Sequence, residues 1–246
     1  MLPHKWYIAG TGNMGSALGD LLQKSDDIEF GGWLSRNVSS SFEPVFDFET
    51  HTDKSAGVFL CIPDRFIASA ATALKQRFSA VVHCSGMQPL FQPCDAVCWP
   101  MQTFSAQVPP VWNDVPVFIE SRLPELGQAL TLLFQKAGSK PLISGLHERQ
   151  TAHLAAVIAN NFSNAMFVFA GEVLTASDLD PKMLLPIIRQ TVQKLQHLNP
   201  NEAQTGPAIR ADYNSIELQA ELLKNKPEWQ RLYSEISTAI PILFKK

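Results

Sequence analysis

The stretch Ile8-Ala9-Gly10-Thr11-Gly12-Asn13-Met14-Gly15 decides the fold of the first half of the chain. It places a Gly-x-Gly-x-x-Gly pattern directly after a short apolar run and at the start of a helical pattern. In this context the first glycine permits a tight turn, the second lets the backbone approach a pyrophosphate, and the third allows close helix–strand packing. The stretch therefore predicts a dinucleotide site at residues 10–15, and a tight turn without a ligand is the alternative.

The sequence around this stretch alternates between strand-like and helix-like patterns over the first 145 residues. Short β-branched or aromatic runs predict strands at 6–9, 29–34, 58–62, 80–84, 96–99 and 115–120. Apolar residues at helical spacing predict helices at 14–24 and 65–78. This alternation is typical of strand–helix–strand units in a parallel sheet.

The pattern changes after Gly145 and is helical to the end of the chain, with predicted helices at 147–176, 181–198, 213–223 and 228–243. Asp180 followed by Pro181 is a typical helix start, and Pro186 should kink or restart that helix. We therefore expect an α/β protein, with a dinucleotide-binding domain at 1–145 and a smaller, all-helical domain at 146–246.

The composition excludes several classes of partner. The chain has 246 residues, 20 Lys plus Arg against 23 Asp plus Glu, and a formal net charge of −3. This balance lacks the broad attraction to phosphate backbones or anionic lipid that a basic chain would have, so we expect no nucleic acid or membrane partner. Only 17% of residues are charged, against a usual share of about 25%, which indicates a homo-oligomer that hides apolar surface.

The expected location is the cytoplasm. The longest apolar stretch, residues 154–169, is interrupted by three asparagines and is not predicted to span a membrane. Residues 1–5 lack the features of a signal peptide. In a reducing compartment the simplest expectation is a free thiol at Cys61, Cys84, Cys94 and Cys98. A zinc site at Cys94 and Cys98 is the alternative, but its spacing matches no zinc motif, so no metal is expected.

The end of the second predicted strand indicates which cofactor binds. Ser35, Arg36 and Asn37 follow the strand, where an NAD-preferring site would carry a carboxylate. A hydroxyl, a guanidinium and an amide can bind a 2′-phosphate, so NADP (NADPH) is favoured over NAD, with a solvated Arg36 as the alternative. Ile62 and Pro63 end the next long strand, where we expect their backbone to border the cofactor.

Polar residues on the long predicted helix are the first candidates for catalysis. Arg149, His153, Asn160 and Asn164 fall on one face at offsets of 4, 11 and 15. His153 could donate or accept a proton, and Asn160 could orient a carbonyl or imine. A solvent-facing stripe or a buried structural histidine is an equal alternative.

Three further segments have a chemical character. His83-Cys84-Ser85-Gly86 ends a strand where the nicotinamide half of a dinucleotide would lie, which makes His83, Ser85 and Gly86 candidate cofactor ligands. Residues 100–104 end the next strand. Residues 205–212 form a Gly-Pro turn in which Arg210 could bind an anionic substrate, with an ordinary helix entry capped by Asp212 as the alternative.

These segments together resemble a family of Rossmann-like NADP oxidoreductases with a helical second domain of long unassigned function, related to pyrroline-5-carboxylate reductase and phosphogluconate dehydrogenase. The resemblance covers nearly the whole chain, and its specific parts are residues 153–162 and 205–212. It implies a phosphogluconate-dehydrogenase-like helical domain whose long helix forms both the substrate cleft and a homodimer interface. Trp99 stands where the family usually has histidine, and Ala211 where it usually has glycine.

Missing residues narrow the chemistry. No lysine lies between Lys140 and Lys182, so the helix lysine that hydroxyacid dehydrogenases of this architecture use as an acid is absent. The predicted activity is hydride transfer between NADP(H) and a small C=N or C=O substrate, with His153 or water handling the proton. The alternative is a non-catalytic NADP-binding sensor or assembly protein.

Overall fold

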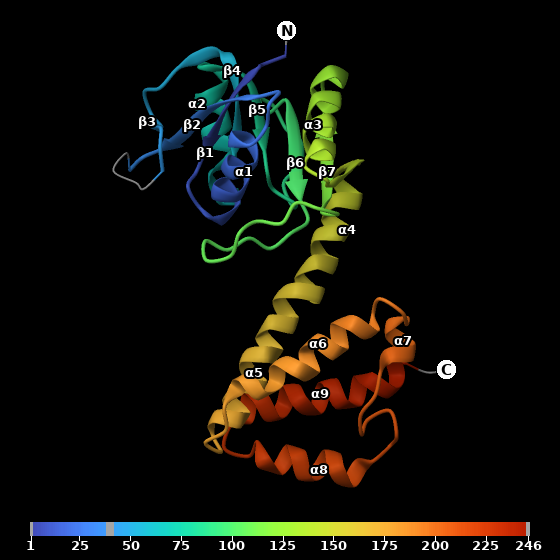
Figure 1. Cartoon of the computed structure of the whole chain (residues 1–246). Helices are drawn as coiled ribbons and strands as arrows, with labels where there is room; N and C mark the ends of the chain where they lie inside the picture. The colour runs from blue at the N-terminus through green and yellow to red at the C-terminus, as the bar shows by residue number, and fades with distance from the viewer. Residues whose placement is uncertain (1, 38–41, 245–246) are drawn as a thin grey trace. The chain divides into compact units, whose positions relative to one another are not determined.

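The computed structural model describes residues 2–37 and 42–244, which belong to two compact units, residues 1–161 and 162–246. The described part of the first unit contains a sheet of eight strands in the order β3-β2-β1-β4-β5-β6-β7-β8, and among these strands only the β6–β7 pair is antiparallel (Figure 1). The strands are β1 (Lys5–Ala9), β2 (Glu29–Ser35), β3 (Val45–Asp47), β4 (Asp53–Leu60), β5 (Phe78–His83), β6 (Ala96–Pro100), β7 (Pro116–Ser121) and β8 (Lys140–Ile143).

Two hydrophobic cores lie on opposite faces of this sheet. Helices α1 (Asn13–Gln23) and α3 (Pro124–Lys136) contribute to one core, while the short η1 (Asp64–Phe66) leads into α2 (Ile67–Lys75), which contributes to the other. Successive residues of β1 alternate between the two: Trp6 and Ile8 join the first core, and Tyr7 and Ala9 join the second. This period of two is the expected consequence of strand geometry.

One long helical stretch, residues 146–175, continues from the first unit into the second. It consists of α4 (Leu146–Ala156), the π-helix η2 (Val157–Phe162) and α5 (Ser163–Thr175). By length and composition alone the stretch could cross a membrane, with a mean hydropathy of 1.4 and none of its most apolar window buried. Core helices of soluble proteins meet the same criterion, so this is weak evidence.

In its described residues, 162–244, the second unit has helices and no strand, as the sequence predicts. They are α5, η3 (Pro181–Leu184), α6 (Leu185–Lys194), α7 (Pro200–Ala203), α8 (Tyr213–Leu222) and α9 (Pro227–Leu243). The Asp180 side chain accepts a hydrogen bond from the Lys182 backbone N–H and so caps η3. A new helix begins at Leu185, with Pro186 in its first turn, so the predicted restart is confirmed.

The predicted α/β class with a helical second part is confirmed, but three elements of the first unit were missed. These are β3, α3 and β8. The predicted boundary at residue 145 matches the start of α4, yet residues 146–161 group with the sheet. The reason is that Arg149 forms an ion pair with Glu120 at 2.7 Å, and Gln150 donates a hydrogen bond to the Met87 carbonyl at 3.0 Å.

Candidate functional site

The three glycines of the opening stretch have three different physical roles. Gly10 has a φ of +111°, and a Cβ there would lie 2.3 Å from the Cys61 carbonyl oxygen. A Cβ on Gly15 would lie 2.0 Å from the Gly10 oxygen, so α1 approaches β1 too closely for a side chain. Around Gly12, however, no atom lies within 4 Å of the added Cβ. The absence of a side chain at Gly12 therefore leaves open space in front of α1.

The N-terminus of α1 faces this open space without a side-chain cap. Gly12 is the N-cap residue, and no side chain accepts a hydrogen bond there. Because the first N–H groups of a helix lack partners within the helix and carry the positive end of its dipole, they form a site for an anion. The predicted pyrophosphate position thus has both the space and the donors that the group needs.

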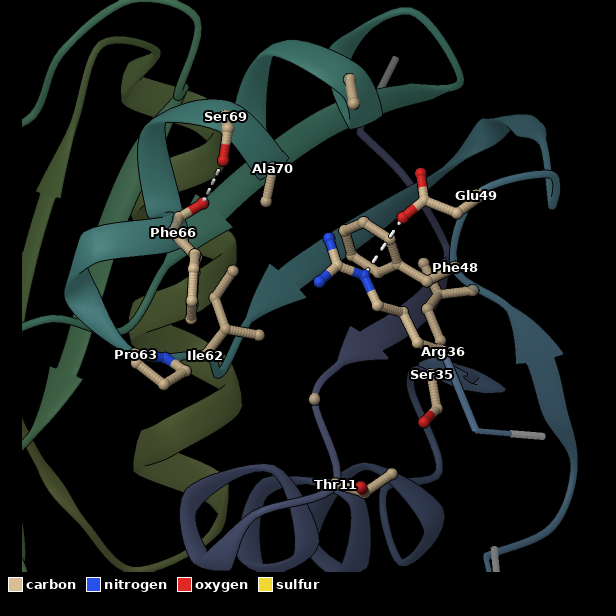
Figure 2. A pocket seen from close by; sticks show the side chains of 13 residues that line it. Thr11, Ser35, Arg36, Phe48, Glu49, Ile62, Pro63, Phe66, Ser69 and Ala70 are labelled. Carbon is tan, nitrogen blue, oxygen red and sulfur yellow. Dashed lines mark hydrogen bonds and ion pairs between the residues drawn. The ribbon is translucent and has the colours of Figure 1, made fainter. Parts of the chain in front are cut away.

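A cavity of about 390 Å³ opens on one side of the glycine loop and is named here the Arg36 cavity (Figure 2). It lies at the carboxyl ends of β1, β2 and β4, where parallel sheets bind nucleotides. Six predicted cofactor residues line it, namely Gly10, Thr11, Ser35, Arg36, Ile62 and Pro63. Residues that the sequence did not predict also line it: Leu34, Phe48, Glu49, Phe66, Ser69, Ala70 and Ala73.

Glu49 corrects the expectation that no carboxylate lies beside Arg36. Nε of Arg36 donates a hydrogen bond to Oε1 of Glu49 at 3.1 Å, and the guanidinium carbon lies 5.6 Å from the centre of the Phe48 ring. Glu49 was missed because it follows β3, a strand of three residues that is too short for a clear pattern. The backbone N–H of Asn37, the third predicted residue here, donates to Ser35 Oγ at 3.1 Å, and Asn37 does not line the cavity.

A second cavity, of about 460 Å³, opens beside the other end of the glycine loop and is named the His153 cavity. All its lining residues belong to the first unit. Predicted residues Asn13, Met14, His153 and Asn160 line it, as do Trp99, Met101, Gln102, Thr103, Phe104, Ala156, Val157, Ala159 and Asn161. Gly10 and Thr11 of the glycine loop therefore line one cavity, and Asn13 and Met14 line the other.

The predicted polar stripe on the long helix is only partly correct. His153 and Asn160 share a cavity, but Arg149 is fully buried against Glu120, and Asn164 does not line the cavity. The π-helix at Val157–Phe162 accounts for the change at Asn164 alone, because its wider turn shifts the positions that follow it around the helix axis. It also brings Asn161, which the α-helical spacing did not select, to the His153 cavity.

His153 is held by packing. Its ring centre lies 5.3 Å from that of Trp99, and a Cβ on Gly86 would lie 2.5 Å from Cδ2 of His153. Gly86 therefore leaves space for the His153 ring. Gly86 itself does not line either cavity. No hydrogen bond within residues 2–37 and 42–244 engages a ring nitrogen of His153, and the residue lines the cavity.

His83 and Ser85 stabilise the turn after β5. The His83 ring is fully buried; Nδ1 accepts from the Ser85 N–H at 3.3 Å, and Nε2 lies 3.1 Å from the Pro89 oxygen, to which it donates in this tautomer. Burial lowers the pKa of His83 to about 4, so the ring is neutral at pH 7. Ser85 Oγ donates to Asp64 at 2.8 Å. Both side chains are thus occupied by the protein and neither lines the two cavities, while their role as cofactor ligands stays a prediction.

Arg210 belongs to the second unit, in the turn before α8. Asp212 accepts hydrogen bonds from the backbone N–H and the hydroxyl of Ser215, at 3.1 and 2.7 Å, so the helix-cap alternative is observed for this residue. Ala211 has a φ of +53°, a left-handed conformation that favours glycine. This is the position where the family that the sequence resembles usually has glycine. Arg210 makes no contribution to the two cavities of the first unit.

The four cysteines are free thiols, as expected. Sγ of Cys61 lies 3.7 Å from Sγ of Cys84, at the ends of the neighbouring strands β4 and β5. This contact, together with burial, raises the pKa of Cys61 well above its usual range. Burial also raises the pKa of Cys94, to about 12. These thiols behave as small apolar side chains at pH 7.

Comparison with known proteins agrees with this architecture. The model of a family described as a domain of unknown function (DUF2520) matches residues 115–240, just over half of the chain. No curated protein gives a significant match. A Bacteroides fragilis protein provisionally named an NADP oxidoreductase has a TM-score of 0.88 at 27% identity, over 97% of this chain and 98% of its own.

Two reductases share the fold at lower identity. Plasmodium falciparum pyrroline carboxylate reductase, solved with NADP bound, has a TM-score of 0.61 at 11% identity, over 96% of this chain and 98% of its own. Streptococcus pyogenes 1-pyrroline-5-carboxylate reductase has a TM-score of 0.60 at 16% identity, over 96% of this chain and 97% of its own.

Proposed function

This chain belongs to the family described as a domain of unknown function (DUF2520), and we propose that it is an NADP(H)-dependent oxidoreductase acting on a small C=N or C=O substrate. The observation that carries the proposal is the uncapped N-terminus of α1 between the Arg36 cavity and the His153 cavity. The name of the Bacteroides fragilis relative supports the same class of activity.

The first unit offers a suitable environment for each part of the cofactor. The Arg36 guanidinium can bind a 2′-phosphate, and Phe66, Ile62 and Ala70 provide an apolar wall for an adenine ring. The free N–H groups at Gly12 and the start of α1 suit the pyrophosphate. The His153 cavity then receives the nicotinamide end, and the bound nicotinamide supplies the hydride.

Side chains of the His153 cavity would position the substrate and handle the proton. A ring nitrogen of His153 can hold the proton that the reduced carbonyl oxygen or imine nitrogen takes up, while the Asn160 amide donates a hydrogen bond to the same polarised bond. Trp99 and Gly86 keep the imidazole in place. We retain Arg210 as a candidate for binding an anionic group of the substrate, on the sequence pattern of its turn alone.

We further propose that the active protein is a homodimer. Large apolar side chains of the second unit are widely exposed, with Ile187 65%, Leu222 81% and Leu243 70% accessible. A second copy that packs against these helices would remove such side chains from water.

The proposal can be tested in two stages. NADPH should raise the unfolding temperature, because a ligand at about 100 times its Kd stabilises by about 2.7 kcal/mol. Arg36→Ala should reduce this effect more for NADPH than for NADH. Candidate imines and 2-oxo acids are then scanned for NADPH oxidation with the intact chain and with His153→Ala.

The matched control is His147→Ala, an exposed histidine on the same helix that lines neither cavity. We expect His153→Ala to lower kcat about 100-fold or more with little change in NADPH affinity, and His147→Ala to leave both unchanged. Equal turnover in the two variants would remove His153 from the mechanism. NADPH binding without turnover of any substrate would favour a sensor, and absence of NADPH binding would refute the proposal.

A further inference from the structure

The ion pair between Arg36 and Glu49 lies at the edge of the Arg36 cavity and bears on which nicotinamide cofactor this cavity prefers. Glu49 engages Arg36 through Nε alone, at 3.1 Å, and the guanidinium lies over the Phe48 ring. In Figure 2 the two terminal nitrogens of Arg36 point away from Glu49, toward the side where Ile62 and Phe66 lie. The carboxylate therefore holds the guanidinium by one edge while the other edge faces the cavity.

A hydrogen-bonded turn at residues 47–50 holds Glu49 in this position. Oδ1 of Asp47 accepts hydrogen bonds from the backbone N–H groups of Glu49 and Thr50, at 3.0 and 2.9 Å, and from the Thr50 hydroxyl at 2.8 Å. The hydrogen bond from Thr50 is the main cause that lowers the pKa of Asp47. Ser35 pairs with Asp47 across β2 and β3, so the loops that carry Arg36 and Glu49 leave the sheet at the same edge.

This arrangement has opposite effects on the two nicotinamide cofactors. A 2′-phosphate on the free edge of Arg36 gains two hydrogen bonds but adds its charge next to the Glu49 carboxylate. A ribose 2′-hydroxyl, by contrast, can donate a hydrogen bond to a carboxylate, which is how NAD-specific sites of this fold recognise it. Arg36 thus favours NADPH, while Glu49 opposes it and favours NADH.

We propose that Glu49 is a residue that determines cofactor selectivity. Its charge reduces the preference for NADPH over NADH that Arg36 creates, so that the chain binds both cofactors. This inference rests on the proposed function, because it assigns a role within the same cofactor site. Removal of the Glu49 charge should make the site more selective for the 2′-phosphate.

The test compares Glu49→Gln with the unchanged chain by titration calorimetry. The isosteric glutamine keeps a hydrogen-bond acceptor for Arg36 but has no charge. The probes are NADPH, NADH and two fragments that differ only in the 2′-phosphate, adenosine 2′,5′-bisphosphate and adenosine 5′-monophosphate. We expect the ratio of affinities, 2′-phosphorylated over unphosphorylated, to rise about three- to tenfold for both pairs, and less at high salt.

Glu125→Gln is the control, since it removes the same charge from an exposed position in the first turn of α3, away from both cavities. It should leave the ratios unchanged. An unchanged or lower ratio in Glu49→Gln, or the same change in both variants, would overturn the role of Glu49. If the unchanged chain binds neither cofactor, it is the proposed function that fails.

Discussion

The two units differ in how their apolar side chains are covered. In the first unit, Ile8 and Phe59 are fully buried in the core on one face of the sheet, and Val58 and Val81 are fully buried in the core on the other. In the described part of the second unit, only Ala208 and Leu223 are less than a tenth exposed. The first unit therefore completes its own core, whereas the second has the apolar composition of a core but leaves these side chains accessible. This contrast is the basis of the proposed homodimer, in which a second copy would cover the exposed apolar side chains of the helical unit.

Truncation of a core residue in the first unit should have the largest effect. Phe59 is fully buried in β4 and stacks near Trp6, with ring centres 4.7 Å apart. We expect Phe59→Ala to lower the free energy of unfolding by about 3–5 kcal/mol, measured by urea denaturation, at every protein concentration. A loss of unfolding free energy below about 1 kcal/mol, or one that depends on protein concentration, would contradict the view that the first unit completes its own core.

A pH dependence of stability should originate in the same unit. The folded-state pKa of His83 is about 4, below the usual value near 6.5, because burial disfavours the charged ring. Between these values the unfolded chain binds the proton and the folded chain does not. Stability from this group is therefore complete above about pH 6.5 and falls by about 2–3 kcal/mol as the pH drops to 4. Urea denaturation midpoints at pH 7, 5.5 and 4.5 should fall less steeply with decreasing pH in His83→Asn than in the unchanged chain. Parallel midpoint-versus-pH profiles for the two proteins would show that His83 is not the source of the pH dependence.

An exposed apolar residue of the second unit should affect assembly. Ile187 in α6 is 65% exposed, and Val108 in the first unit is 63% exposed. If a second copy covers the helical unit, Ile187→Ser should weaken the dimer by about 1–2 kcal/mol, or roughly five- to thirtyfold in Kd. Val108→Ser should leave the Kd unchanged. Analytical ultracentrifugation measures both, and a monomer at every concentration would refute the dimer.

The smallest effect should come from Ala211 in the second unit. At its φ of +53°, a residue with a Cβ atom is strained, whereas glycine is not. Ala211→Gly should therefore raise the free energy of unfolding by about 0.5–1 kcal/mol, part of the gain being offset by the flexibility of glycine when unfolded. Thermal denaturation at fixed protein concentration would detect this, and a lower melting temperature would show that the local strain is absent.

Much of the nucleotide site could be predicted because its determinants are local. The glycine loop, Arg36 and the strand end at Ile62 are adjacent to strong strand and helix patterns, and the structure places them at one cavity. The resemblance to NADP oxidoreductases with a helical second domain is also confirmed. Glu49 and Phe66 could not be predicted, since they reach that cavity only through the pairing of β3 with β2 and the packing of α2.

The sequence by itself determined the order of the main strands and helices apart from β3, α3 and β8, the change from alternating to helical structure near residue 145, and the position of the glycine loop. These follow from periodicity and from backbone limits that act within a few residues. Only the tertiary structure decided that Arg36 meets a carboxylate, that His83 is buried and neutral, and that a π-helix lies between His153 and Asn164. The physical reason is that charge pairing, burial and helix register depend on neighbours far apart in the chain.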